Sequence, residues 1–186
     1  MANRILGICG SLRAKSFNRL ALTAAGEAMP EVMTLAIASI ADIPLYSQDV
    51  QDAGIPPSVT QLRDAILAAD GLLIACPEYN FSVSGVLKNA IDWMSRVTPQ
   101  PFQDKPAAVL SATAGPLGGA RAQYDLRRIL ACLGAQWLQK PEVFIGVAQT
   151  KFGADGKLAD EATRKFIGLQ MVAYADWIAR MKRAFA

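Results

Sequence analysis

The stretch GLLIACPEYNFSVSGVLKNAI, residues 71–91, decides the fold of this chain. It opens with a continuous apolar run, GLLIAC, which is typical of a β-strand that is buried on both faces. Pro77 ends the run, and after a polar and aromatic loop the residues Leu87, Ala90 and Ile91 recur at helical spacing. A strand covered on both faces and followed by a helix is the repeating unit of a parallel α/β sheet.

The same unit recurs along the chain. Apolar runs predict strands over residues 4–9, 31–38, 71–76, 107–112 and 143–147. A helical stripe lies between each strand and the next, and residues 39–57, rich in Pro, Asp and Gln, predict a long loop before the second helix. Because right-handed crossovers place helices on both faces, the pattern predicts a doubly wound parallel sheet. The length of 186 residues suits a single domain over residues 1–186.

The last helical stripe comprises Ile167, Met171, Tyr174, Ile178, Met181 and Phe185. Alternating steps of four and three occur in coiled coils and in helices that pack on a sheet, and we favour the second interpretation. In doubly wound sheets, ligands bind beyond the carboxyl ends of the strands, at the point where the strand order reverses. The loops after the first, third and fourth strands are therefore the candidate site.

Composition limits the class of protein. The chain is 52% hydrophobic and 19% charged, which predicts a compact globular fold. It shows neither a secretory signal pattern nor an apolar run long enough for a membrane span, so we expect a cytoplasmic protein without a membrane partner. The net charge of +3 is scattered and does not predict nucleic-acid binding. Cys9, Cys76 and Cys132 are far apart and predict reduced, buried thiols.

The sequence contains no histidine. This excludes Ser-His-Asp hydrolysis and Cys-His nucleophilic catalysis, and it removes the commonest transition-metal ligand. We therefore expect no metal site, and any chemistry must come from other residues or from a bound cofactor.

The loop after the first strand, GICGSLRAKSFN at residues 7–18, fails three known phosphate-loop patterns. A Walker loop needs glycine where this chain has Cys9 and Ala14, and the dinucleotide fingerprint Gly-x-Gly-x-x-Gly is absent, because only Gly7 and Gly10 are available. A small phosphotyrosine phosphatase needs arginine six residues after its cysteine, where this chain has Lys15.

What remains in that loop is a set of hydroxyl and amide side chains, Ser11, Ser16 and Asn18, with the cation of Arg13 ahead of a helix. A helix N-terminus favours an anion, so the loop predicts a site that holds a terminal phosphate without Mg²⁺. The alternative is a plain helix start in which Ser16 is the N-cap and Arg13 is solvated.

The other two loops suit a flat ring. The loop after the third strand offers aromatic, amide and backbone groups, in the order Pro77, Glu78, Tyr79, Asn80 and Phe81. The loop over residues 113–119 has three glycines, so its backbone can approach a ligand closely. Each loop alone is also compatible with an ordinary surface turn. Together, a phosphate site beside a gap for a ring indicates flavin mononucleotide, FMN.

Four segments, GSLRAKSFN, PEYNFSVSGVLKNAIDW, GPLGGARAQYDLRRIL and DIPLY, resemble the NADPH-dependent FMN reductases, and most closely their chromate- and quinone-reducing branch. The resemblance implies a flavodoxin-like α/β fold with five parallel strands in the order 2-1-3-4-5. It also implies which residues bind FMN. The phosphate and ribityl end would be held by Ser11, Leu12, Arg13, Ser16, Phe17 and Asn18. The isoalloxazine would be lined by Pro77, Glu78, Tyr79, Asn80 and Phe81, and closed by Thr113 and Gly115.

The resemblance further implies a homodimer or homotetramer with the flavin near a subunit interface. In related tetramers an aromatic at the position of Phe81 joins a polar network with the counterparts of Arg121, Tyr124 and Glu142. Relatives often have tyrosine where this chain has Phe81, so the hydroxyl group is missing here.

The implied activity is hydride transfer from NADH or NADPH to FMN, and then electron transfer to small acceptors such as quinones, chromate and other oxyanions, or azo compounds. No catalytic side chain is needed, which agrees with the absence of histidine. Two alternatives stay open at this point. One is a non-enzymatic electron carrier of the flavodoxin type, although such carriers are usually strongly acidic and this chain has a net charge of +3. The other is a flavodoxin-like domain without flavin.

Overall fold

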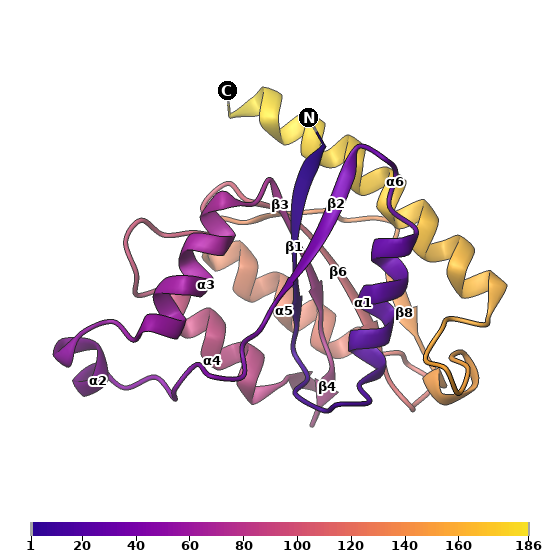
Figure 1. Ribbon diagram of the computed structural model, residues 1–186, viewed down its shortest axis with the longest axis horizontal. Helices are drawn as coiled ribbons and strands as arrows, with labels where there is room; N and C mark the ends of the chain where they lie inside the picture. Colours follow the sequence, from indigo (N-terminus) through magenta and orange to yellow (C-terminus); the bar gives the residue numbers. More distant parts are fainter. Residues whose placement is uncertain (1, 186) are drawn as a thin grey trace.

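The computed structural model describes residues 2–185, in which a parallel sheet lies between two layers of helices (Figure 1). The strands of the main sheet are β1 (Asn3–Cys9), β2 (Met33–Ala38), β3 (Gly71–Ala75), β6 (Pro106–Ala112), β7 (Gln136–Trp137) and β8 (Val143–Ile145). Their order is β2-β1-β3-β6, with β7 and β8 both paired to β6. All pairs are parallel, so the predicted flavodoxin-like order 2-1-3-4-5 is confirmed, with two short strands sharing the fifth place.

Helices cover both faces of this sheet. They are α1 (Phe17–Glu27), α2 (Gln48–Ala53), α3 (Pro57–Ala68), α4 (Gly85–Met94), α5 (Ala120–Cys132) and α6 (Glu161–Ala184), with a 3₁₀ turn at Ala148–Thr150. Side chains of α1 and α6 pack into the apolar core on one face, and those of α3, α4 and α5 pack into the core on the other. Within residues 2–185, none of the helices is both long and apolar enough to cross a membrane.

The strand β3 explains why the opening stretch is decisive. All of its residues are buried, because the helices of both layers pack against it. Tyr174 of α6, fully buried, donates its hydroxyl hydrogen to the carbonyl oxygens of Leu72 and Pro106 at 2.7 and 3.1 Å. One side chain thus ties the last helix to the two central strands.

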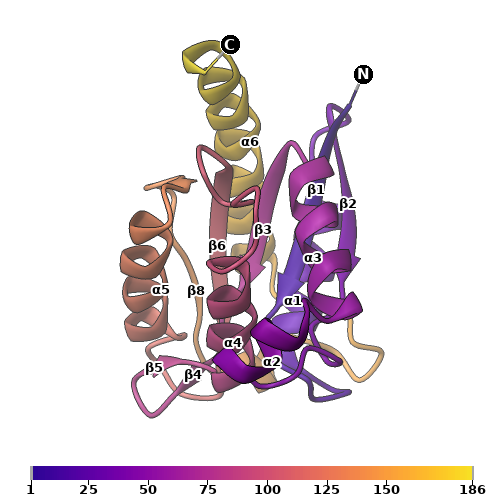
Figure 2. The ribbon, with the colours of Figure 1, turned by 90° about the vertical axis from the view of Figure 1, so that its left-hand side faces the viewer.

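Several boundaries differ from the sequence prediction. The second strand begins at Met33, because Glu31 and Val32 lie in an exposed turn, and the last strand ends at Ile145 because Val147 has a positive φ of 49°. The helix α2 was not predicted within the 39–57 connection. It has no buried residue and therefore no apolar stripe that would indicate a helix. The loop after β3 contains a short hairpin of β4 (Glu78–Tyr79) and β5 (Ser82–Val83), which Figure 2 shows beside the start of α5.

Two further predictions need correction. The stripe of α6 packs on the sheet as predicted, but its buried part ends at Ile178, and Phe185 is exposed because it follows the last helical residue. Of the three thiols, Cys9 and Cys76 are buried, whereas Cys132 is exposed because it ends α5 on the helix face that points away from the core.

The carboxyl ends of the parallel strands lie together at one end of the molecule, which is the lower end in Figure 1. The loops that follow β1, β3 and β6 gather there, while both chain ends lie at the opposite, amino end of the sheet (Figure 1). The fold therefore brings together the three loops that the sequence indicates as the site.

Candidate functional site

The three loops enclose two adjoining cavities. The first, of about 190 Å³, is lined by Ser11, Arg13, Ser16, Phe17, Asn18, Pro77, Glu78, Tyr79, Ala112, Thr113 and Ala114. The second, of about 510 Å³, is lined by Gly10, Ser11, Leu12, Arg13, Tyr79, Ser84, Gly85 and Val86. Because Ser11, Arg13 and Tyr79 border both, we name them the inner and the outer cavity of one site.

Asn18 fixes the inner cavity. It is buried in the first turn of α1, and its Nδ2 donates to the carbonyl oxygen of Ala112 at 2.8 Å. The backbone N–H of Ala112 donates in return to Asn18 Oδ1 at 3.1 Å. This reciprocal pair ties the loop after β1 to the end of β6. Asn18 therefore shapes the cavity, because both ends of its amide hold backbone groups of Ala112.

Gly10 and Ser84 join the loop after β1 to the start of α4. The hydroxyl of Ser84 donates to the carbonyl oxygen of Gly10 at 2.6 Å and accepts the N–H of Leu87, which caps the helix. A Cβ atom at Gly10 would lie 2.7 Å from Pro77 Cδ, so the two loops approach too closely for any side chain there. Sequence analysis missed both residues, although a serine three residues before Leu87 is an N-cap signal.

The start of α1 has groups free for an anion. Ser16 is buried and caps the helix by accepting the N–H of Arg19 at 3.4 Å, so the N-cap interpretation of this residue is correct. The N–H groups of the first helical residues, Phe17 and Asn18, have no intrahelical acceptor. Within residues 2–185 the exposed guanidinium of Arg13 forms no ion pair. Together with the helix dipole, these donors favour a phosphate.

Glu78 has a structural task that the sequence did not reveal. Its carboxylate accepts the backbone N–H groups of Arg121 and Ala122 at 3.1 and 3.4 Å, and its Oε1 pairs with the Arg121 guanidinium at 3.1 Å. The N-cap residue of α5, Gly119, has no side chain to do this. Glu78 borders the inner cavity, but its charge is already satisfied by the N-terminus of α5 and by Arg121.

Asn80 and Phe81 form the tip of the β4–β5 hairpin. Both have positive φ, 48° and 69°, as in a type I′ turn. Phe81 is 67% exposed and lies under the Arg121 guanidinium, 4.0 Å from its ring centre. Neither residue borders the two cavities within this chain. Gly115 does not border them either, and its carbonyl oxygen accepts the Thr113 hydroxyl at 3.1 Å.

A buried polar network positions the loop after β6. Ser111 donates its hydroxyl hydrogen to the carbonyl oxygen of Gly118 at 2.5 Å, and Gln123 Nε2 donates to Ser111 Oγ and to the carbonyl oxygen of Val143, both at 2.7 Å. The positive φ values of Gly118 and Gly119 let the chain turn from this loop into α5. The buried side chains of Ser111 and Gln123 therefore hold this loop, and its first residues, Thr113 and Ala114, border the inner cavity.

The buried thiol beside these loops, Cys76, is a structural group. Burial, with the negative charges of Glu78 and Asp125, raises the pKa of the Cys76 thiol to about 12, so Cys76 stays protonated. Among residues 2–185, no group of three or more metal-ligating side chains occurs. A larger cavity, of about 790 Å³, lies between β8 and the start of α6. Its Asp160 pairs with Lys151 and its Glu142 pairs with Arg127, so these charges are already compensated.

Ten of the thirteen residues predicted from the sequence border the inner or outer cavity, and Asn80, Phe81 and Gly115 do not. A comparison with family models gives a match over residues 3–150 to the NADPH-dependent FMN reductases. The chain belongs to this family. The resemblance inferred from the loop sequences is thereby confirmed.

Individual relatives span almost the whole chain. An NAD(P)H-dependent FMN reductase of Pseudomonas aeruginosa is 50% identical over 96% of this chain and 97% of its own length. A quinone reductase of Escherichia coli K12 is 43% identical with the same coverage. Among solved structures, the flavoenzyme NAD(P)H:(acceptor) oxidoreductase FerB from Paracoccus denitrificans superposes with a TM-score of 0.89 at 34% identity, covering 97% of this chain and 99% of that one.

The residues present fit the FMN that the family implies. Arg13, which has no ion pair among residues 2–185, and the N–H groups at the start of α1 suit its terminal phosphate, which needs donors and no metal. The outer cavity, with Leu12, Val86 and the half-exposed ring of Tyr79, is apolar enough for a flat aromatic ring.

Proposed function

We propose that this chain binds FMN across the inner and outer cavities and catalyses electron transfer from NADH or NADPH, through the flavin, to a quinone. The observation that carries the proposal is the junction of the two cavities, in which a phosphate-binding helix start and an open apolar pocket share Ser11, Arg13 and Tyr79. Membership of the FMN reductase family and the relatives named quinone reductase favour an enzyme over a flavodoxin-type carrier.

The inner cavity would hold the phosphate and ribityl chain. Arg13 supplies the counter-charge, and the N–H groups of Phe17 and Asn18 supply hydrogen bonds along the helix dipole. Asn18 contributes by fixing the loop through its hydrogen bonds with Ala112, while the Ser16 hydroxyl accepts the Arg19 N–H and keeps its own hydrogen to donate to the phosphate. A pre-formed site of this kind loses little entropy when the phosphate binds.

The outer cavity would hold the flavin ring and leave one face open. When bound, FMN supplies the redox chemistry, since it accepts a hydride from a nicotinamide and passes the electrons on. The chain contributes position: Leu12, Tyr79 and Val86 border the outer cavity, Pro77 and Thr113 border the adjoining inner cavity, and the backbone N–H groups of the loops can stabilise negative charge on the ring. Donor and acceptor would use the same open face in turn, which explains why no acid or base residue is required.

The range of acceptors belongs to the same proposal. Chromate, other oxyanions and azo compounds are expected beside quinones, because an open ring face discriminates little among acceptors and Arg13 attracts anions. We also propose a cytoplasmic homodimer or homotetramer. The exposed rings of Phe81 and Tyr124 support an assembly, while Arg121 and Glu142 are paired within the chain, with Glu78 and Arg127.

The test is the visible absorbance spectrum of the purified protein under anaerobic conditions, before and after NADH or NADPH is added and then after a quinone. We expect a flavin spectrum that bleaches with the nicotinamide coenzyme and recovers with the quinone. A flavin spectrum that neither coenzyme changes would indicate the carrier. A colourless protein that does not bind added FMN would refute the proposed site.

A further inference from the structure

A third cavity adjoins the outer cavity at Leu12 and Arg13. It has a volume of about 170 Å³ and lies between the loop after β1 and the end of β2. It is lined by Cys9, Ser11, Leu12, Arg13, Ala14, Arg19, Ala38, Ser39, Ile40 and Ala41. It shares Ser11, Leu12 and Arg13 with the outer cavity, so one extended ligand can reach both.

This third cavity is positively charged without compensation. Within residues 2–185, neither Arg13 nor Arg19 has a carboxylate within 4.0 Å. Five other arginines do have such partners, whereas Arg4, Arg96, Arg180 and Arg183 have none among residues 2–185, so what distinguishes Arg13 and Arg19 is that both border the same cavity. The nearest acidic residue along the chain after β2, Asp42, does not line the cavity. Arg19, together with Arg13, which is shared with the flavin site, therefore favours an anion in this small cavity.

The end of β2 has the right chemistry for a particular anion. In doubly wound folds that bind dinucleotides, an acidic residue at this strand end binds the 2′-hydroxyl of NAD, whereas a nearby arginine accommodates the 2′-phosphate of NADP. Here Ala38 ends the strand and Ser39 follows it, so a hydroxyl group occupies the place of the carboxylate. Ser39 Oγ accepts the N–H of Ala41 at 3.2 Å, which leaves its own hydrogen free to donate.

We propose that this cavity binds the 2′-phosphate of NADPH, and that Arg19 is the residue that selects NADPH over NADH. The inference rests on the proposed function, because the nicotinamide end of the same molecule would enter the outer cavity. The volume of about 170 Å³ suits a phosphate group with part of a ribose and is too small for a whole adenosine. Arg13 serves the flavin site as well, whereas Arg19 borders only this cavity, which makes Arg19 the position to test.

The experiment compares the kcat/KM values for NADPH and NADH at a fixed quinone concentration, with FMN content measured for each protein. In Arg19→Gln, we expect kcat/KM for NADPH to fall about tenfold to a hundredfold, as for the loss of a charge-assisted hydrogen bond. The value for NADH should stay within about twofold, since NADH lacks the phosphate. Ser39→Asp should shift the ratio in the same direction by repelling the phosphate.

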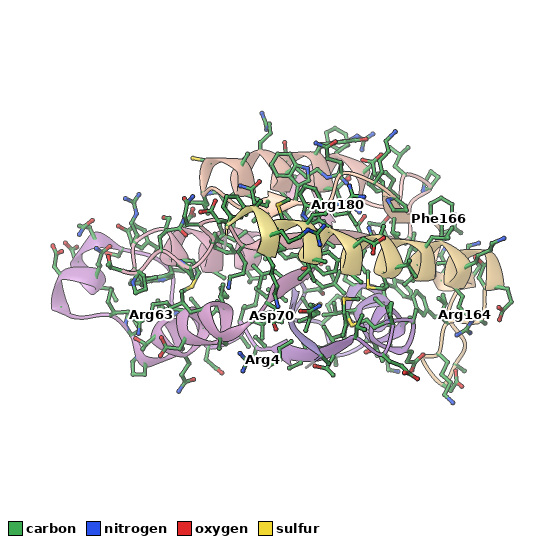
Figure 3. The ribbon with its side chains drawn as sticks, turned by 90° about the horizontal axis from the view of Figure 1, so that it is seen from above. Arg4, Arg63, Asp70, Arg164, Phe166 and Arg180 are labelled. Carbon is green, nitrogen blue, oxygen red and sulfur yellow. The ribbon has the colours of Figure 1, made fainter. Side chains whose placement is uncertain are left out.

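The matched control is Arg180→Gln, which removes the same charge from α6 near the amino end of the sheet (Figure 3). This control variant should change kcat/KM for neither NADPH nor NADH. An equal loss for both coenzymes in Arg19→Gln, or a loss of FMN, would place Arg19 in the flavin site and overturn the proposal. An unchanged NADPH value would overturn it as well.

A binding measurement keeps this proposal separate from the redox activity. In calorimetry, adenosine 2′-monophosphate should bind to the wild-type protein and only weakly to Arg19→Gln. It should also compete with NADPH more strongly than adenosine 5′-monophosphate does. If inorganic phosphate displaces it at similar concentration, the cavity accepts any phosphate and the assignment to NADPH fails. If adenosine 2′-monophosphate binds as expected but neither coenzyme reduces the flavin, the subsite stands and the proposed function is wrong.

Discussion

The two ends of the sheet use polar residues in opposite ways. At the amino end, polar groups are paired with one another: Asp70 accepts the backbone N–H of Arg4 and the ammonium of Lys182, both at 2.7 Å (Figure 3). At the carboxyl end, Asn18 holds backbone groups in place while Arg13 stays without an ion pair among residues 2–185. The amino end therefore contributes stability, and the carboxyl end keeps binding capacity for a ligand.

Lys105 shows how completely the amino end is closed. Its ammonium donates to the carbonyl oxygens of Leu67 and Ala69, at 3.3 and 2.7 Å, where α3 ends. Burial lowers the pKa of Lys105, and the nearby charge of Asp70 partly offsets this effect. Lysine at a helix C-terminus also compensates the dipole. A cation that is half buried and held by two carbonyls is a structural group, unlike the exposed Arg13.

The largest effect is expected from Asn18→Ala, which tests whether the polar groups of the carboxyl end serve binding. The change leaves the buried N–H and C=O of Ala112 without their side-chain partner, which costs about 2–4 kcal/mol of unfolding free energy. It also frees the loop that borders the inner cavity, so FMN affinity should fall. Urea unfolding and fluorimetric FMN titration measure the two effects, with the exposed Gln139→Ala as control. If the variant loses stability but keeps its FMN affinity, Asn18 serves stability alone, and the proposed difference between the two ends of the sheet is wrong.

A smaller effect is expected from Asp70→Asn at the amino end. Burial alone would raise the pKa of Asp70, but hydrogen bonds from Lys182 and from the Arg4 N–H outweigh it, so the pKa lies below 3.8. Because the folded-state pKa is depressed, this carboxylate stabilises the protein above its unfolded pKa and loses that contribution as pH falls through the folded pKa. Lys182 is half exposed, so we expect a cost of about 1 kcal/mol or less at neutral pH.

Unfolding of wild type and Asp70→Asn at pH 7 and at pH 3 measures this prediction. The difference between them should shrink at the lower pH, while FMN affinity should be the same for both at pH 7. A loss of FMN affinity would mean that the two ends are coupled through the sheet. An equal difference at both pH values would mean that the charge of Asp70 contributes nothing.

Sequence reasoning located the site because strand ends are readable. Pro77 ends a fully apolar strand and Gly10 ends the first one, so the loops that follow could be assigned to the same end of the sheet. The local sequence does not predict which hydrogen-bond partners a side chain in those loops has in the folded chain. Glu78 caps a helix that begins 42 residues later, and that contact exists only in the folded chain.

The same limit explains the other differences. The helix α2 has no buried residue, so its sequence shows no helical periodicity of apolar residues. The strands β4 and β5 have two residues each, which is too few to show an alternation of apolar and polar residues. The role proposed for Arg19 needed the end of β2 beside the start of α1, a neighbourhood set by the strand order. Patterns of burial could be predicted from the chain, whereas partners far apart in sequence could not.

The smallest effect concerns the reactivity of the cysteine thiols. It tests whether the carboxyl end, which has the capacity to bind a ligand, also has a reactive thiol. Cys76 lies beside the site but is fully buried with its pKa raised to about 12, whereas Cys132 is exposed at the far end of α5. A thiol-reactive probe should therefore label the folded protein rapidly at one position, and all three thiols only after unfolding. Cys132→Ser should abolish the rapid phase. If that variant is still labelled rapidly, a buried thiol opens to solvent, and the carboxyl end is less pre-formed than its hydrogen bonds to Asn18 and Ser84 indicate.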